Sequence, residues 1–211
     1  MLLNQAPHNL DLWQWICGMP ESVTAFCDIA KYHNIEVEDD ATIFIRYKNG
    51  ATGVFMTSTG EYPGTNRLEI SGDLGKIVLE NGVMKWYHIK ESVSEVIANS
   101  KQGFAQIDCG YEEIKQERPE SSHRGILQNF ANAVLFGEEL ISPGYDGINE
   151  LTLSNAAYLS EWQGNREITL PFDSELFDNL LAEKVKLSKR HAAYSEKSGN
   201  ASYLPRWQVR W

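Results

Sequence analysis

The sequence predicts an α+β fold: a large, mostly antiparallel (mixed) β-sheet with helices packed on one face and the other face left for oligomerisation. Three observations predict it. Helical spacing opens the chain and returns after about residue 121. Apolar residues alternate with polar ones between about residues 41 and 90. The order of helix, strands and then helices lacks the regular strand–helix alternation that builds a parallel sheet.

The opening helix is indicated by Leu10, Trp13 and Ile16, which recur at helical spacing. Pro7 is tolerated in a first helical turn, where its missing N–H group costs nothing. Gly18 ends the run. Residues 21–33 are expected to form a second short helix or a loop.

The strands are indicated by turn signals between alternating runs. Asn49-Gly50 and Asn81-Gly82 are hairpin pairs, because both residue types accept positive φ, and "SGDLGK" (residues 71–76) is a further turn. Four or five antiparallel strands are therefore expected between 41 and 90, with another possible strand at "CGYEEIKQE" (109–117).

Helical spacing covers residues 121–138, 148–165 and 174–190, and "REITLPFD" (166–173) is a short strand. We expect residues 1–180 to form one domain and residues 181–211 to form the end of the last helix and a tail.

Composition narrows the possible functions. The chain of 211 residues is 42% hydrophobic and carries a formal net charge of −10, which argues against nucleic-acid and anionic-membrane partners. Neither a membrane-spanning run nor a secretory leader is visible, so a cytoplasmic location is expected. The 3 cysteines are irregularly spaced, which favours buried thiols over disulfides or a zinc site. We expect no metal.

The chemically suggestive groups are Asn4, His8 and Asp11, spaced i, i+4 and i+7, which puts them on one helix face. An imidazole exchanges protons with hydroxyl groups near neutral pH, and a nearby carboxylate can orient it. The alternative is a histidine bonded to backbone at a helix start, with Asp11 on a solvated surface.

Other candidates are weaker. The glycines at 72 and 75 lie between strands and open no helix, so they do not form a dinucleotide cradle. Tyr62, in the loop "GEYPG", either contacts a ligand or belongs only to a turn. His123, near a helix start, either lines the same cleft as His8 or has a capping or surface role.

The segment "LLNQAPHNLDLWQWICGMPESVTAF" closely resembles the helix that opens the C-terminal domain of the Gfo/Idh/MocA oxidoreductases, a family that includes glucose–fructose oxidoreductase and inositol dehydrogenase. The family pattern, roughly D/N-x-x-x-H-x-x-D followed by aromatic and small residues up to a glycine, is filled by Asn4, His8, Asp11, Trp15 and Gly18. The resemblance continues through "TNRLEISGDLGKIVLENG" and "EITLPFD", in the family's order, to about residue 180.

The resemblance implies a two-domain enzyme whose N-terminal Rossmann domain binds NAD or NADP and supplies a catalytic lysine. This chain resembles the second domain alone, without those elements. By position, His8 matches the histidine that exchanges a proton with the substrate hydroxyl. Asn4 stands where many members carry an aspartate, so it can hydrogen-bond but not relay a proton. Asp11 matches a supporting acidic position.

The resemblance thus implies the substrate-binding and oligomerisation domain of a NAD(P)-dependent sugar or polyol dehydrogenase. As a fragment it is expected to show no turnover, and to form a dimer or tetramer through the open sheet face. The alternative is a stand-alone carbohydrate-binding or interaction domain that has lost its cofactor domain.

Overall fold

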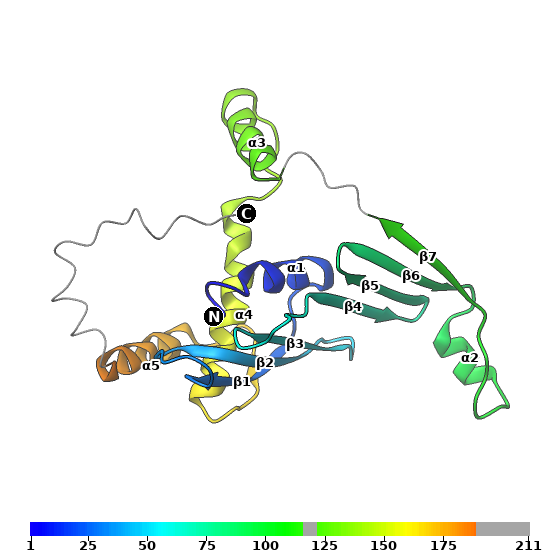
Figure 1. Ribbon diagram of the computed structural model, residues 1–211, viewed down its shortest axis with the longest axis horizontal. Coiled ribbons are helices and arrows are strands. Elements are labelled where there is room, and N and C mark those ends of the chain that lie inside the picture. The colour runs from blue at the N-terminus through cyan, green and yellow to red at the C-terminus, as the bar shows by residue number, and fades with distance from the viewer. Residues whose placement is uncertain (116–121, 189–211) are drawn as a thin grey trace. The chain divides into compact units, whose positions relative to one another are not determined.

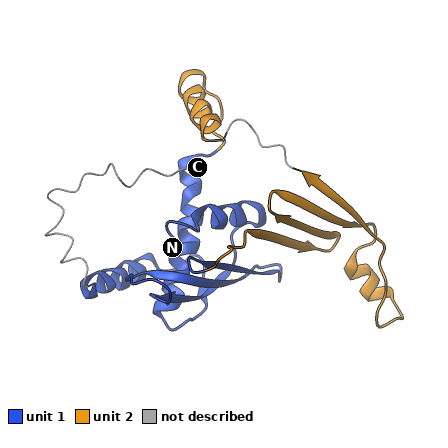
Figure 2. Cartoon of the chain, viewed as in Figure 1, with its two compact units in different colours: residues 1–60, 142–211 blue, residues 61–141 orange. Residues whose placement is uncertain are grey.

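The computed structural model describes residues 1–115 and 122–188, which form two compact units (Figure 2). Unit 1 combines Met1–Gly60 with the chain from Ser142 onward, and unit 2 is Glu61–Ile141. Within the described residues all strand pairs are antiparallel. The α+β class is therefore confirmed, although the strands divide into two four-stranded sheets rather than one large sheet.

Unit 1 contains a sheet in the order β3-β2-β1-β8 together with three α-helices (Figure 1). Its elements in chain order are α1 (Pro7–Cys17), β1 (Ser22–Ile29), β2 (Glu38–Arg46), β3 (Thr52–Ser58), the 3-10 turn η1 (Gly144–Asp146), α4 (Gly147–Trp162), β8 (Ile168–Thr169) and α5 (Ser174–Leu187). Residues 181–187 thus complete α5, and residues 189–211 lie outside the described part of the chain.

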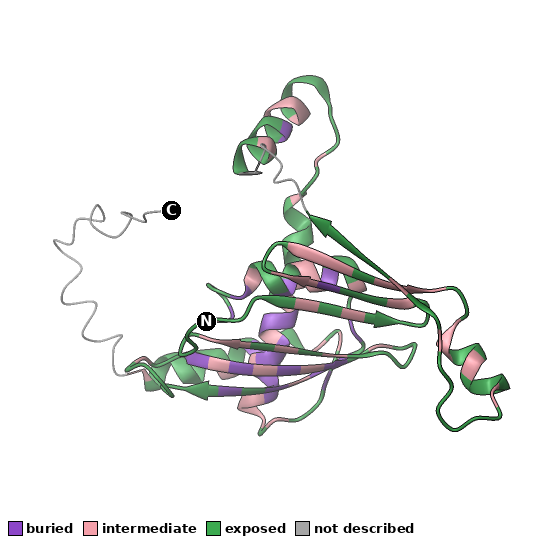
Figure 3. Ribbon diagram, turned by 45° about the vertical axis from the view of Figure 1, so that its right-hand side comes forward, coloured by how far each residue is buried: buried purple, intermediate pink, exposed green. Residues whose placement is uncertain are grey.

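The core of unit 1 lies between one face of this sheet and α4. Alternate residues of β1 and β2 are buried (Figure 3), and they pack with Leu153, Ala156 and Leu159 of α4. Ala156 has no exposed surface, and its small side chain lets the helix approach β1 closely. Each large apolar side chain buried here contributes roughly 1.5–3 kcal/mol. The opposite face of the sheet is exposed at Phe26 and Met56.

The expectation of a helix or loop over residues 21–33 is wrong for its first part, because Ser22–Ile29 form the central strand β1. Val23, Ala25 and Cys27 point into the core. The alternation was hard to detect because Phe26, on the opposite face, is also apolar.

Unit 2 contains β4 (Arg67–Gly72), β5 (Gly75–Glu80), β6 (Val83–Ile89), β7 (Cys109–Lys115), α2 (Val93–Asn99) and α3 (Ser122–Phe136). The sheet order β4-β5-β6-β7 follows the chain. The turns predicted at residues 71–76 and at Asn81-Gly82 are present, and the latter pair has φ of 53° and 73°. The short helix α2 was not expected.

Among residues 1–115 and 122–188, no helix is long and apolar enough to cross a membrane.

Candidate functional site

The helix α1 has one buried face, which fixes its orientation in unit 1. Leu2, Ala6 and Leu10 follow one another at intervals of four residues and are almost completely buried. The amides of Asn4 and Gln5 already donate to the carbonyl of Met1, at 3.0 and 2.8 Å, so the chain is coiled before Pro7. The turn and the helix therefore act as one element.

The opposite face of this element carries the chemically suggestive side chains. Asn4, His8 and Asp11 are all exposed, and Trp15, one turn further along, is 77% exposed. Asn4 lies in the turn before the helix and His8 in the first helical turn. Asp11 accepts a hydrogen bond from Nε2 of Gln14 at 2.9 Å. The structure therefore presents these groups together, outward from unit 1.

The two remaining candidates belong to unit 2. Tyr62 is 98% exposed in the loop that precedes β4, and His123 is exposed in the first turn of α3. They lie on elements separate from Asn4, His8 and Asp11.

The turn that carries Asn4 is held by a buried carboxylate. Glu38, only 3% exposed on β2, accepts hydrogen bonds from the Met1 ammonium at 2.7 Å, from the Leu2 amide at 2.6 Å and from the Tyr158 hydroxyl at 2.7 Å. Burial works to raise the pKa of Glu38, but these three donors outweigh it and the pKa is lowered. Glu38 therefore stays ionised and joins the turn to β2 and α4.

The middle of α1 is held by a close contact with β3. A Cβ atom on Gly53 would lie 2.3 Å from Cζ2 of Trp13, so only glycine leaves room for this indole. The ring of Trp13 also stacks on Phe55, with centroids 6.0 Å apart. These contacts fix the helix on the sheet.

Sequence reasoning did not identify Glu38 or Gly53 as part of the site's support. Glu38 belongs to the acidic run "EVEDD", which is typical of a solvated loop. The glycine inside a strand was a usable signal, since such glycines often mark close approach of another group.

The three thiols are all free. Cys27 is buried as expected, and burial together with the nearby carboxylates Glu38 and Glu161 raises its pKa to about 12. Cys109 is exposed, so the expectation of a buried thiol is wrong there. The part of the chain that the structure describes contains no group of three or more His, Cys, Asp or Glu that could hold a metal ion.

Comparison with known families gives a match to the GFO/IDH/MocA C-terminal domain over residues 1–78. This segment includes α1 and Glu38, the residue of β2 that accepts hydrogen bonds from the turn before the helix. No curated protein sequence matches the chain.

Several solved structures are similar to the chain. The WlbA dehydrogenase from Bordetella pertussis, in complex with NADH and UDP-GlcNAcA, is 26% identical with a TM-score of 0.53, over 82% of this chain and 45% of its own. An oxidoreductase from Agrobacterium radiobacter in complex with NAD+, L-tartaric acid and magnesium is 22% identical with a TM-score of 0.57, over 80% and 48%. The UDP-N-acetylglucosamine 3-dehydrogenase GnnA from Acidithiobacillus ferrooxidans is 17% identical with a TM-score of 0.58, over 75% and 46%.

The last two likenesses establish the fold alone. In all three cases the chain spans about half the length of the structure it matches.

Proposed function

We propose that the chain, which matches the GFO/IDH/MocA C-terminal domain over residues 1–78, is the substrate-binding and oligomerisation part of a NAD(P)-dependent sugar or polyol dehydrogenase. The observation that carries the proposal is the outward face of α1, where Asn4 and His8 stand exposed on an anchored element. A proton-transfer group is effective only when its position is fixed.

The described residues do not fit a dinucleotide. Residues 72–75 form the turn between two antiparallel strands, and Gly75, with a φ of 137°, packs against the backbone of Tyr87. A dinucleotide phosphate needs a glycine turn that opens a helix. In the proposal, NAD or NADP is therefore held by a domain outside this chain, which also supplies the lysine.

His8 has the chemistry for the hydroxyl proton of the substrate. An imidazole can take or return a proton in the neutral pH range, and the ring of His8 is open to a substrate. The amide of Asn4 can donate to one hydroxyl group and accept from another, but it carries no proton to transfer. We assign proton exchange to His8 and positioning of the sugar or polyol to Asn4, with Asp11 as a supporting polar group and Tyr62 and His123 as further substrate contacts.

Assembly is the second half of the proposal. On the exposed face of unit 1, Phe26 and Met56 flank Thr42 across three strands, and Phe44 pairs with Val54 in the next row. Phe26, Val54 and Met56 are 57%, 59% and 75% exposed. A contiguous apolar sheet face of this kind favours packing against a second copy.

The test measures turnover with and without the neighbouring domain. The 211-residue chain, mixed with NAD+ or NADP+ and a panel of polyols, is expected to give no reduced cofactor and no dinucleotide binding. The chain joined to an in-frame cofactor domain is expected to turn over. There His8→Ala should lower kcat about 10²–10⁴-fold, whereas the exposed neighbour Asn9→Ala should not.

Turnover by the chain alone, or equal activity of the two variants, would refute the proposal. The lack of a phosphate cradle among the described residues favours one alternative, a stand-alone carbohydrate-binding or interaction domain. A neighbouring coding sequence without a G-x-G-x-x-G motif would support that alternative.

A further inference from the structure

A pocket of about 540 Å³ lies in unit 1 at the end of α1 opposite to His8. Its walls come from residues 19–21 after α1, the β2–β3 hairpin at residues 47–49, Thr152 on α4 and residues 170–171 after β8. The volume falls within the range of about 300–1,000 Å³ that is usual for small-molecule sites. Because α1 rises about 1.5 Å per residue, the pocket begins roughly 15 Å from His8.

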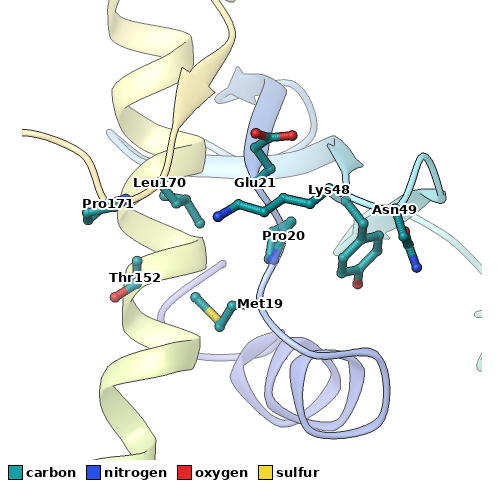
Figure 4. Close-up of a pocket in the computed structure, with 9 residues that line it drawn as sticks. Met19, Pro20, Glu21, Lys48, Asn49, Thr152, Leu170 and Pro171 are labelled. Atoms are coloured by element: carbon teal, nitrogen blue, oxygen red, sulfur yellow. The ribbon is translucent and has the colours of Figure 1, made fainter.

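The pocket contains two opposite charges that are not neutralised by neighbours. Lys48 extends across it toward Leu170, and Glu21 lies on its rim (Figure 4). Neither side chain forms an ion pair or a hydrogen bond with another residue in the described ranges. The pocket is therefore neutral overall but offers both a strong donor and a strong acceptor.

The other polar groups have their hydrogen-bonding direction fixed by the backbone. The Thr152 hydroxyl donates to the carbonyl of Ile148 at 2.7 Å, so its oxygen can only accept from a ligand. The Asn49 side-chain oxygen accepts from the Ala51 amide at 3.0 Å, so its NH2 group remains as a donor. Two donors and two acceptors thus line one pocket.

The wall that carries Glu21 is rigid. The Glu21 amide donates to the carbonyl of Arg46, and its carbonyl accepts from the Leu170 amide, both at 2.8 Å. Pro20 is buried beside it, and Leu170 and Pro171 supply further apolar surface.

We propose that this pocket is a second binding site, for an uncharged polyhydroxylated ligand of the size of a hexose or hexitol. A hydroxyl group donates and accepts at once, so adjacent hydroxyls satisfy Glu21 and Lys48 together. A simple anion would be repelled by the carboxylate of Glu21, and a simple cation would be repelled by the ammonium group of Lys48. The apolar surface of Pro20 and Leu170 suits the C–H face of such a ligand. The inference does not depend on the proposed role of His8.

The test is saturation-transfer NMR and titration of the 211-residue chain with glucose, myo-inositol and sorbitol as probes. At least one probe is expected to bind the wild type. Lys48→Met and Glu21→Gln should each weaken binding about tenfold, since each removes a charged hydrogen-bonding group. The matched substitutions Lys90→Met and Glu91→Gln, at exposed positions of unit 2, should leave the affinity unchanged.

Charged probes sharpen the assignment. Glucuronate should bind the wild type more weakly than glucose does. Glu21→Gln should reverse that order, because the positive charge of Lys48 is then no longer balanced by a carboxylate in the pocket. His8→Ala should bind the neutral probe as the wild type does, which separates this pocket from the proposed catalytic face. Absence of binding by all three neutral probes, equal affinity of Lys48→Met, or loss of binding in His8→Ala would overturn the assignment.

Discussion

The hydroxyl of Tyr158 on α4 donates to the buried carboxylate of Glu38 on β2 at 2.7 Å, across 120 positions of sequence. The same carboxylate oxygen accepts a hydrogen bond from the Leu2 amide. One buried anion thus joins the turn that carries Asn4, the central sheet and the main core helix.

Replacement of Glu38 tests this junction. Glu38→Ala leaves the donors of Met1, Leu2 and Tyr158 buried without an acceptor, and we expect the free energy of unfolding to fall by about 3 kcal/mol. Tyr158→Phe removes one hydrogen bond and should cost about 1 kcal/mol. Urea denaturation followed by circular dichroism gives both values. A loss in Glu38→Ala no larger than that of the exposed control Glu91→Ala would contradict the junction.

The lowered pKa of Asp39, the neighbour of Glu38, leads us to expect that the free energy of unfolding depends on pH. Burial works to raise its pKa, but hydrogen bonds from the amides of Tyr32, His33 and Lys31 dominate and lower it to about 2. In the unfolded chain the carboxylates of Asp39 and Glu38 take up protons near pH 4, which is a higher pH than in the folded protein. The two carboxylates therefore contribute fully to the free energy of unfolding above about pH 4. This contribution is lost as the pH falls from about 4 toward 2.

Urea midpoints measured between pH 7 and pH 2.5 check this dependence. The wild type should lose stability steeply below pH 4, and Asp39→Asn should start from a lower midpoint and fall less steeply. Parallel curves for the two proteins would show that Asp39 does not contribute to the acid transition.

Replacement of Gly53 by alanine is expected to cause a steric clash. In Gly53→Ala the new methyl group meets Trp13 and Ile45, so we expect a loss of about 1–3 kcal/mol in the free energy of unfolding. Gly64→Ala is the control, because a Cβ atom there meets nothing within 4 Å. In a Trp13→Phe background the added cost of Gly53→Ala should shrink, since contacting residues are not additive. An equal cost in both backgrounds would mean that the indole is not the obstacle.

We expect that the substitution Tyr47→Phe does not destabilise the fold. The hydroxyl of Tyr47 is buried beside the thiol of Cys17, which is a weak hydrogen-bonding group, and it has no other hydrogen-bond partner in the described ranges. Burial raises its pKa to about 12. Tyr47→Phe removes an unsatisfied polar group, so the free energy of unfolding should stay constant or rise by up to about 1 kcal/mol. The same exchange at Tyr158 should have the opposite sign. A loss of 1 kcal/mol or more in Tyr47→Phe would reveal a stabilising partner for the hydroxyl.

Local signals in the sequence were sufficient for much of the fold. Asn49-Gly50 and Asn81-Gly82 specify their hairpins by backbone preference alone, and the spacing of Leu10 and Trp13 specifies α1. The strand β1 was missed because Phe26 places an apolar residue on its open face. The division into two sheets depends on pairings such as Val23 with Ile168, which no local pattern encodes.

For the candidate site, too, the sequence predicts local features but not contacts between distant residues. The spacing of Asn4, His8 and Asp11 is a local property, and it predicts that they share one helix face; their exposure is seen only in the folded chain. The burial of Glu38 depends instead on Leu2 and Tyr158, which lie far away in the sequence, so its acidic neighbours gave a misleading indication of a surface position.

The exposed sheet face of unit 1 predicts self-association. We expect light scattering at tens of micromolar to give a mass that is a multiple of the chain mass of 23.9 kDa. Met56→Asp places a charge within one of the two apolar rows of the face, beside Phe44 and Val54 in the next row, and should shift the protein to monomer, because an unpaired charge in an apolar interface is costly. Leu74→Asp, at a turn residue of unit 2 that is 61% exposed, is the matched control and should not change the mass. A monomeric wild type, or an unchanged mass in Met56→Asp, would exclude this face as the interface and leave α3, with its exposed Leu127 and Val134, as the next surface to test.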